Sequence, residues 1–269
     1  MYWIDGYVIL IGLMVGSFLN VCIYRVPRGR SVVQPRSACP HCNHPISALE
    51  NIPVLSYLLL GRKCRQCGAG ISWVYPLVEA FTGVLFYLLY IKYGFQTPFW
   101  VNIVFFSILV ILIFIDLFER LLPNVFTLGG LAIGFVMAPF QSGEFFPDLG
   151  PISLSAVMLR YVDSFLGVLM GAGFLWLVAE MYLRLKKVEG MGFGDIKMMA
   201  MVGAFLGWQL TWMTILLGSL IGALVGSFYI YVLGKGAKYE LPFGSFLAVG
   251  AMISTLWGES LITAYLSQF

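Results

Sequence analysis

Long apolar runs dominate this chain and restrict what it can fold into. A helix needs about 20 consecutive, mainly apolar residues to cross the hydrocarbon of a bilayer. Only 11% of the 269 residues are charged, against about 25% in soluble domains. We therefore expect an all-α polytopic membrane protein with about eight transmembrane helices, of which the sixth is short and interrupted by glycine. The expected spans are 6–24, 76–93, 99–118, 124–140, 161–183, 195–209, 210–233 and 244–266.

The basic residues gather in alternate connections between these runs. Most of the 16 Lys and Arg residues fall in segments 25–75, 119–123, 184–194 and 234–243. Because basic loops stay on the cytoplasmic side of a membrane, eight alternating helices predict a cytoplasmic loop 25–75 and both termini outside. The net charge of +3 is too small to indicate a nucleic-acid partner. The first apolar run lacks a basic segment before it and a small-residue cleavage site after it, so we expect a retained helix.

Four of the five cysteines form two pairs inside loop 25–75. Cys39 and Cys42 make one C-x-x-C pair, and Cys64 and Cys67 make the other. Four thiolates at this spacing suit a tetrahedral, closed, structural Zn²⁺ site. Two disulfides, a 4Fe–4S cluster and four unligated thiols are the alternatives, and the cytoplasmic placement disfavours disulfides. We favour zinc, which gives a cytoplasmic zinc-binding loop between the first two helices.

Two aspartates lie at ends of apolar runs. Asp116 is near the end of 99–118, and Asp195 opens 195–209. Charged residues in spanning segments are costly and are therefore functional candidates. Two carboxylates that share a proton can activate water and polarise a scissile carbonyl. The alternative is that each carboxylate caps a helix or pairs with a nearby Lys, and Asp195 is well placed for an N-cap.

Glycines at four-residue spacing indicate where helices pack closely. Gly218, Gly222 and Gly226 follow this spacing in the run 210–233. Gly167 and Gly171 do the same in the run 161–183. Small residues at this spacing let helix backbones approach one another. We interpret both sets as helix–helix contacts and not as ligand grooves.

Short motifs follow one another along nearly the whole chain, and together they are specific. They are Gly16-Ser17-Phe18-Leu19-Asn20-Val21, Tyr24-Arg25-Val26-Pro27, the two cysteine pairs, Tyr75-Pro76-Leu77-Val78-Glu79, Ile115-Asp116-Leu117 with Leu122-Pro123, Gly190-Met191-Gly192-Phe193-Gly194-Asp195-Ile196-Lys197, and Pro242-Phe243-Gly244. In these motifs the chain resembles the bifunctional prepilin peptidases of type IV pilus and type II secretion systems. Many of those proteins carry Asp where this chain has Asn124. Asn keeps the polar and capping character, so we expect activity to be retained.

The resemblance implies a Gly-x-Gly-Asp aspartic endopeptidase with Asp116 and Asp195 as its catalytic pair. Such enzymes remove the short basic leader from type IV prepilins and pseudopilins at the cytoplasmic face of the bacterial inner membrane. They cut after a glycine, usually before phenylalanine. Many members then methylate the new N-terminal amine with S-adenosylmethionine.

The resemblance also divides the chain and assigns contact residues. Residues 1–98, with the cysteine loop, are the expected methyltransferase part, and residues 99–269 are the expected peptidase membrane domain. Glycines beside Asp195 would let an extended peptide approach the backbone closely. The residues expected to contact ligands are Gly192, Gly194 and Lys197 for the peptide and Glu79 for S-adenosylmethionine.

Two other functions fit parts of the sequence. A transporter or proton channel would use the intramembrane acids as ion ligands, but it should show broken helices in two related halves, and only one span is interrupted by glycine. A zinc-dependent scaffold without catalysis would give no reason for acids at the membrane boundary. We therefore favour the enzyme.

Overall fold

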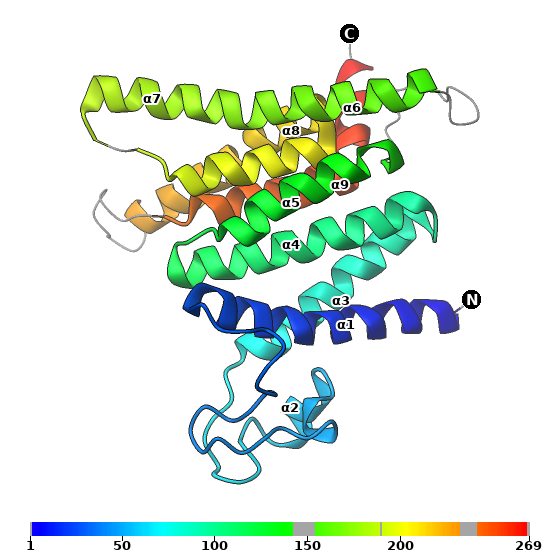
Figure 1. Cartoon of the computed structure of the whole chain (residues 1–269), viewed down its shortest axis with the longest axis vertical. Coiled ribbons are helices and arrows are strands. Elements are labelled where there is room, and N and C mark those ends of the chain that lie inside the picture. Colours follow the sequence, from blue (N-terminus) through cyan, green and yellow to red (C-terminus); the bar gives the residue numbers. More distant parts are fainter. Residues whose placement is uncertain (1, 142–153, 189, 232–240, 268–269) are drawn as a thin grey trace. The chain divides into compact units, whose positions relative to one another are not determined.

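The computed structural model describes residues 2–141, 154–188, 190–231 and 241–267. Apart from two isolated β-bridges in the cysteine loop, the regular structure of these residues is helical, so the expected all-α class is confirmed. The chain divides into two compact units, Met1–Phe99 and Trp100–Phe269. The order of the elements can be followed in Figure 1.

The first unit is built on the contact between α1 (Tyr2–Arg25) and α3 (Val74–Tyr93). Glycines of α1 bring the two backbones together. A Cβ on Gly12 would lie 2.7 Å from the Cα of Gly83, and one on Gly16 would lie 2.7 Å from the Cα of Glu79. The loop between these helices contains the short elements η1 (Val26–Arg28), η2 (Leu49–Asn51) and α2 (Leu55–Leu59).

The second unit is a helical bundle in which α8 contacts α5, α6 and α9. Phe105 of α4 stacks on Phe205 of α8, with 4.5 Å between ring centroids. The side chains of α4 are mostly buried, in keeping with a helix that is apolar on all sides. The elements are α4 (Thr97–Glu119), α5 (Asn124–Met137), η3 (Ala138–Phe140), α6 (Leu154–Val168), the π-helical η4 (Leu169–Gly173), α7 (Phe174–Lys186), α8 (Phe193–Tyr231) and α9 (Phe243–Leu266).

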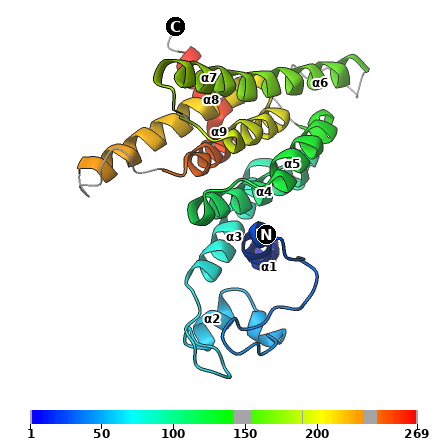
Figure 2. The same cartoon turned by 60° about the vertical axis from the view of Figure 1, so that its left-hand side comes forward.

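Helix α8 turns sharply at Gly207. This residue has φ 72° and ψ 179°, a conformation that is essentially restricted to glycine. A Cβ on Gly171 of η4 would lie 3.0 Å from the carbonyl carbon of Met199 and 3.1 Å from Cγ2 of Thr211. In a straight helix, residues 199 and 211 would be about 18 Å apart. The two arms of α8 therefore fold back on each other (Figure 2).

Asp163 of α6 stabilises this turn. Its Oδ1 accepts the backbone N–H of Trp208 at 3.3 Å, at the start of the second arm of α8. A carboxylate in this position caps the new helix as an N-cap side chain would. The carboxylate also fills the space where a Cβ of Gly207 would lie. The turn therefore needs both the glycine and the acid.

The expected count of eight spans is not confirmed. Among the described residues, six helices are long and apolar enough to cross a membrane. The span expected at 124–140 is a shorter apolar helix, and the spans expected at 195–209 and 210–233 together form α8. The six are Trp3–Arg28, Val74–Tyr93, Thr97–Glu119, Leu154–Lys186, Phe193–Tyr231 and Phe243–Tyr265.

Two expected connections are only partly described. The sequence of 141–160 predicts a loop with a short helix near its end; Leu154 does begin a helix, which runs on into the expected span as α6, and residues 142–153 lie outside the described residues. The same holds for residues 232–240, which include the basic Lys235 and Lys238. A multi-pass membrane protein is nevertheless clear from the six helices.

The expected glycine contacts are present. A Cβ on Gly218 would lie 2.9 Å from the Cα of Leu247 in α9, and one on Gly222 would lie 3.2 Å from Cδ2 of Phe246. Gly167 of α6 lies directly against the backbone of Gly203 in α8. Ser164 adds a hydrogen bond from its hydroxyl to the carbonyl of Ala204 at 2.8 Å. Close backbone packing therefore joins α8 to both α6 and α9.

We expect Gly203→Ala to destabilise the second unit. The added methyl group would collide with the backbone of Gly167, which cannot move aside as a flexible side chain would. Overpacking of this kind costs about 1–3 kcal/mol. The measurement is thermal unfolding in detergent, with Gly129→Ala as the control because a Cβ there meets no atom within 4 Å. Equal unfolding midpoints for the two variants would contradict the close contact.

Candidate active site and metal cluster

Asp116 and Asp195 both lie where a helix ends or begins. Asp116 is in the last turn of α4, and its carbonyl accepts the N–H of Arg120 at 3.0 Å. Arg120 has a positive φ of 52°, the left-handed conformation that commonly ends a helix. Asp195 is in the first turn of α8, and its N–H donates to the carbonyl of Gly192 at 3.1 Å.

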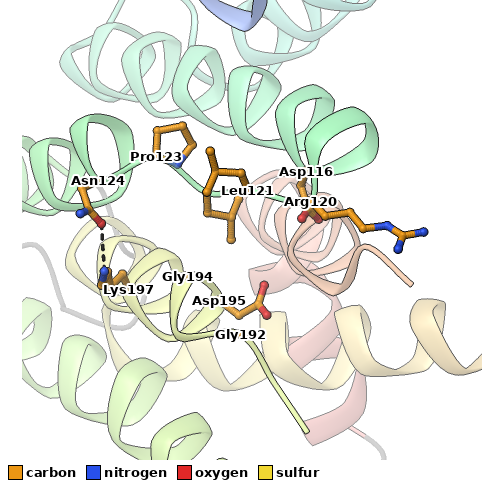
Figure 3. A pocket seen from close by; sticks show the side chains of 10 residues that line it. Asp116, Arg120, Leu121, Pro123, Asn124, Gly192, Gly194, Asp195 and Lys197 are labelled. Atoms are coloured by element: carbon orange, nitrogen blue, oxygen red, sulfur yellow. Dashed lines mark hydrogen bonds between the residues drawn. The ribbon is translucent and has the colours of Figure 1, made fainter. Parts of the chain in front are cut away.

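The two carboxylates meet at Gly244, in the first turn of α9. A Cβ on Gly244 would lie 2.9 Å from Oδ1 of Asp195 and 3.1 Å from Oδ2 of Asp116. The two oxygens are therefore separated by no more than the sum of these distances. Figure 3 shows both carboxylates directed toward the same space from different helices. Both residues are largely buried, with exposed fractions of 6% for Asp116 and 8% for Asp195.

Ser245 holds the carboxylate of Asp116 in place. Its backbone N–H donates to Oδ2 of Asp116 at 2.7 Å, and its hydroxyl lies 2.9 Å from the same oxygen. The hydroxyl also lies 3.1 Å from the carbonyl oxygen of Ile113, so its single proton is shared between two acceptors. The start of α9 presents positive partial charge to Asp116. Asp116 thus serves as a cap on α9 from a distant part of the chain.

The carboxylates open into a pocket of about 350 Å³. Gly192, Gly194 and Lys197, the residues expected to contact a peptide, all line it. A Cβ on Gly194 would lie 3.1 Å from the Cβ of Leu122. The glycine therefore lets the start of α8 pack closely against Leu122. The other lining residues are Arg120, Leu121, Leu122, Pro123 and Asn124 together with the two aspartates.

Lys197 has defined partners at the wall of the pocket. Its Nζ donates to Oδ1 of Asn124 at 2.9 Å (Figure 3) and lies 5.0 Å from the ring centroid of Phe193. Asn124 is the position where the chain departs from the usual Asp of the family it resembles. Here the amide oxygen accepts the hydrogen bond that a carboxylate would otherwise accept. The pocket wall thus combines these polar groups with the apolar side chains of Leu121, Leu122 and Pro123.

Sequence reasoning missed Ser245 and Arg120. Ser245 directly follows the Pro242-Phe243-Gly244 motif but does not belong to it. The available signal was a hydroxyl residue in the first turn of an expected helix, which is a common capping position. Arg120 was counted only as a loop charge, although it closes α4 and lines the pocket.

The arrangement has the parts needed for water-mediated hydrolysis. Two neighbouring carboxylates cannot both ionise easily, because like charges this close repel each other. The ionised member can take a proton from water while the protonated member donates to a carbonyl oxygen. Their burial strengthens both interactions because the surrounding dielectric is low.

The four loop cysteines also come together. Their sulfur atoms lie within 4.8 Å of one another, with 3.8 Å between Cys39 and Cys67 and 3.9 Å between Cys42 and Cys64. A tetrahedral metal with metal–sulfur bonds of about 2.3 Å places its sulfurs about 3.8 Å apart. This cluster therefore has the spacing of a four-thiolate metal site.

The two cysteine pairs lie on two backbone turns of the same kind. Cys39 donates its N–H to the carbonyl of His44 and accepts the N–H of Asn43. Cys64 does the same with Ala69 and Gly68. Asn43 and Gly68 both have a positive φ, and Asn and Gly tolerate this conformation best. The repetition shows that the two pairs form matching halves of one site.

The backbone of these turns favours thiolates. The N–H groups of Cys42 and His41 lower the pKa of the Cys39 thiol to about 7. Those of Cys67 and Gln66 likewise lower the pKa of Cys64. The thiolate is the form that binds metal, so the donor set fits a cation.

Glu79 lies apart from the cysteines, in the second turn of α3. Its side chain is buried, and its Oε2 accepts the N–H of Val54 at 2.7 Å. The carboxylate therefore connects α3 to the cysteine loop within the first unit.

Comparisons with known proteins agree with the geometry. Residues 10–93 match the bacterial peptidase A24 N-terminal domain, and residues 103–227 match the type IV leader peptidase family. Proteins named prepilin leader peptidase/N-methyltransferase are similar over nearly their full length. That of Aeromonas hydrophila is 38% identical over 97% of this chain and 93% of its own length. That of Pseudomonas aeruginosa is 35% identical over 96% of this chain and 92% of its own length. That of Legionella pneumophila is 33% identical over 100% of this chain and 96% of its own length. No solved structure matches the chain.

We expect the purified protein to carry about one metal ion per chain at the four-thiolate cluster. Replacing Cys39 with Ser should remove most of that metal and lower the unfolding temperature, because the loop has little apolar core of its own. Elemental analysis measures the metal. Cys22→Ser is the control, since Cys22 is a buried thiol of α1 outside the cluster. Equal metal content in both variants would refute the site.

Proposed function

Because the chain belongs to the type IV leader peptidase family, we propose that it removes the leader peptide of type IV prepilins and pseudopilins with Asp116 and Asp195. Such processing serves pilus biogenesis and type II secretion. The observation that carries the proposal is the meeting of the two carboxylates at Gly244, inside a pocket that opens beside them.

In this mechanism the two aspartates share one proton and activate a water molecule between them. Asp116, whose Oδ2 accepts the N–H of Ser245 and shares the proton of its hydroxyl with Ile113, is the carboxylate that takes the proton from water. Asp195 then donates its proton to the oxygen of the scissile carbonyl. The tetrahedral diol then breaks its C–N bond as Asp116 gives its proton to the leaving nitrogen and Asp195 takes a proton back from a hydroxyl group. This step releases the new amine and the new carboxyl end and restores the shared proton. The water attacks a peptide bond after glycine, as the family resemblance implies.

Gly192 and Gly194 provide the approach for the substrate. A peptide must be extended to be cut, and residues without a Cβ let it come close to the start of α8. Lys197 lies one turn further along, where its ammonium group can pair with an acid of the mature part of the substrate. The hydrogen bond to Asn124 orients this ammonium group in the absence of substrate.

The site belongs at the cytoplasmic face of the bacterial inner membrane. Support comes from the basic residues of loop 25–75 and of segment 184–194, since basic loops stay cytoplasmic. A prepilin presents a basic leader in the cytoplasm and an apolar helix in the bilayer. Its scissile bond then lies at the boundary, at the level where α4 ends and α8 begins.

Asp116→Asn and Asp195→Asn should each abolish leader cleavage, with a rate loss of at least about 10³-fold. Neither amide can share a proton as the carboxylate pair does. The measurement is the mass of a prepilin after incubation with purified enzyme in detergent. Glu180→Gln, which changes an acid of α7 paired with Arg184 and outside the pocket, should cleave normally. Cleavage by a folded Asp116 or Asp195 variant would exclude this mechanism.

The same experiment separates the competing functions. A transporter or proton channel would depend on these acids for ion movement without cutting the prepilin. A scaffold would tolerate both substitutions. Neither alternative accounts for two carboxylates held against one glycine at a pocket wall.

The metal of the cysteine cluster is proposed to be Zn²⁺ in a structural role. Four thiolates complete a tetrahedral shell, so the site has no open position for catalysis. Cys39, Cys42, Cys64 and Cys67 would hold the ion. Its contribution is the folding energy of a loop with few buried side chains.

The first unit is proposed to carry the N-methyltransferase activity, with S-adenosylmethionine bound beside loop 25–75 and the start of α3. This methyl donor supplies the electrophilic methyl group and carries a positive sulfonium, which a carboxylate stabilises. Glu79 is the proposed contact. Its carboxylate already accepts the N–H of Val54, so a direct contact must leave that hydrogen bond in place or use the other oxygen.

Replacing Glu79 with Gln tests this role. The amide oxygen of Gln still accepts the N–H of Val54, so the loop keeps its anchor while the negative charge is lost. We expect the rate of methyl transfer to fall at least about tenfold, because one charge-assisted contact to the methyl donor is lost. The rate of leader cleavage should stay unchanged. Mass measurement of the product resolves both steps. Normal methylation would remove Glu79 as a contact of the methyl donor.

A further inference from the structure

Helix α2 in the cysteine loop turns an apolar face outward. Leu55, Leu58 and Leu59 are 49%, 63% and 76% exposed. Their spacing of three and four residues places them on one side of the helix. Surface helices normally bury such a stripe against the protein. This face therefore needs an apolar environment outside the loop itself.

A strained turn sets the position of this helix. Val54, directly before α2, has φ 62° and ψ −48°, which is unusual for a β-branched residue. The N–H of Leu55 bonds to the carbonyl of Pro53 at 2.6 Å, closing a three-residue γ-turn. The N–H of Val54 is donated to Glu79 of α3 at 2.7 Å. Such strain persists only where surrounding contacts enforce it, and Glu79 provides that contact.

The anchor places α2 beside the membrane span and not beyond its end. Glu79 is five residues into α3 (Val74–Tyr93), which is about 7.5 Å along the helix axis. That helix is one of the candidate spans. Trp73, which directly precedes it, is 66% exposed, and Trp is typical of the level where bilayer meets water. The start of α2 therefore lies at or just inside that level.

Basic residues follow the apolar face. Arg62, Lys63 and Arg65 come within six residues of the end of α2 and are all exposed. Leucines at the depth of the interface, with cations directly after them, are the combination that binds anionic lipid surfaces. The basic leader of a prepilin would be repelled by the same cations. A bilayer surface is thus a better match for this face than the leader.

We propose that α2 lies in the interfacial layer of the bilayer, on the side where α1 ends and α3 begins. Leu55, Leu58 and Leu59 enter the boundary of the acyl chains, and Arg62, Lys63 and Arg65 contact anionic headgroups. This attachment holds the cysteine cluster against the membrane surface. The proposal rests on the membrane spans and on the contacts of the first unit, and it is independent of the peptidase mechanism.

Hydrogen exchange of the whole protein tests the attachment. The backbone amides of residues 55–62 are compared by mass spectrometry in amphipol, in phosphatidylcholine nanodiscs and in nanodiscs with phosphatidylglycerol. We expect exchange of these amides to slow roughly tenfold from amphipol to phosphatidylglycerol nanodiscs, with a smaller effect in phosphatidylcholine. The double substitution Leu58→Ser/Leu59→Ser should abolish the slowing while metal content and unfolding temperature in amphipol stay unchanged.

Val33→Ser is the matched control, because Val33 is a 78% exposed apolar residue of the same loop outside α2. It should keep the protection of residues 55–62. Equal exchange in amphipol and in both nanodiscs would overturn the proposal. Protection that appears only when a prepilin is added would assign the face to the substrate, and protection that rises with protein concentration would assign it to a second copy. Equal protection in both lipids would overturn the headgroup contact.

Discussion

Three helix ends converge at Gly244, and the chemistry proposed for the second unit depends on that convergence. The last turn of α4 brings Asp116, the first turn of α8 brings Asp195, and the first turn of α9 brings the glycine that separates them. A side chain at Gly244 would occupy the space between the carboxylates. The absence of one Cβ thus allows two acids from different helices to lie close together.

The close packing of α8 makes this convergence possible. Its second arm lies against α9 through Gly218 and Gly222, and its first arm lies against α6 through Gly203. Contacts between backbones leave little freedom for one helix to slide along another. A bilayer provides no hydrophobic driving force for helix association, so such contacts must supply the specificity. The position of Asp195 at the start of α8 is therefore determined by packing contacts further along this helix.

Much of this could be predicted from the sequence because the relevant patterns are local. Apolar runs predicted the helices, and the two cysteine pairs predicted a thiol cluster whose sulfurs do come together. Four-residue glycine spacing predicted close helix contacts, although the partner helix α9 could not be named from the sequence. The break between the spans expected at 195–209 and 210–233 falls close to the turn at Gly207, but its partner Asp163 lies 44 positions earlier and has no local signal in the sequence. The count of eight spans is not confirmed because these two spans together form α8 and because the run 124–140 is a shorter apolar helix.

Long-range hydrogen bonds were beyond the reach of sequence reasoning. Nothing in the vicinity of Ser245 indicates Asp116 as its acceptor, and nothing near Val54 indicates Glu79. The pair of Asp116 and Ser245 has one more consequence, which concerns synthesis of the chain. These residues are 129 positions apart, and α9 is the last of the described helices. A growing chain that has inserted α4 and α8 holds both aspartates but lacks the wall that aligns them. The proposed hydrolytic centre can therefore assemble only after α9 has been translated and inserted.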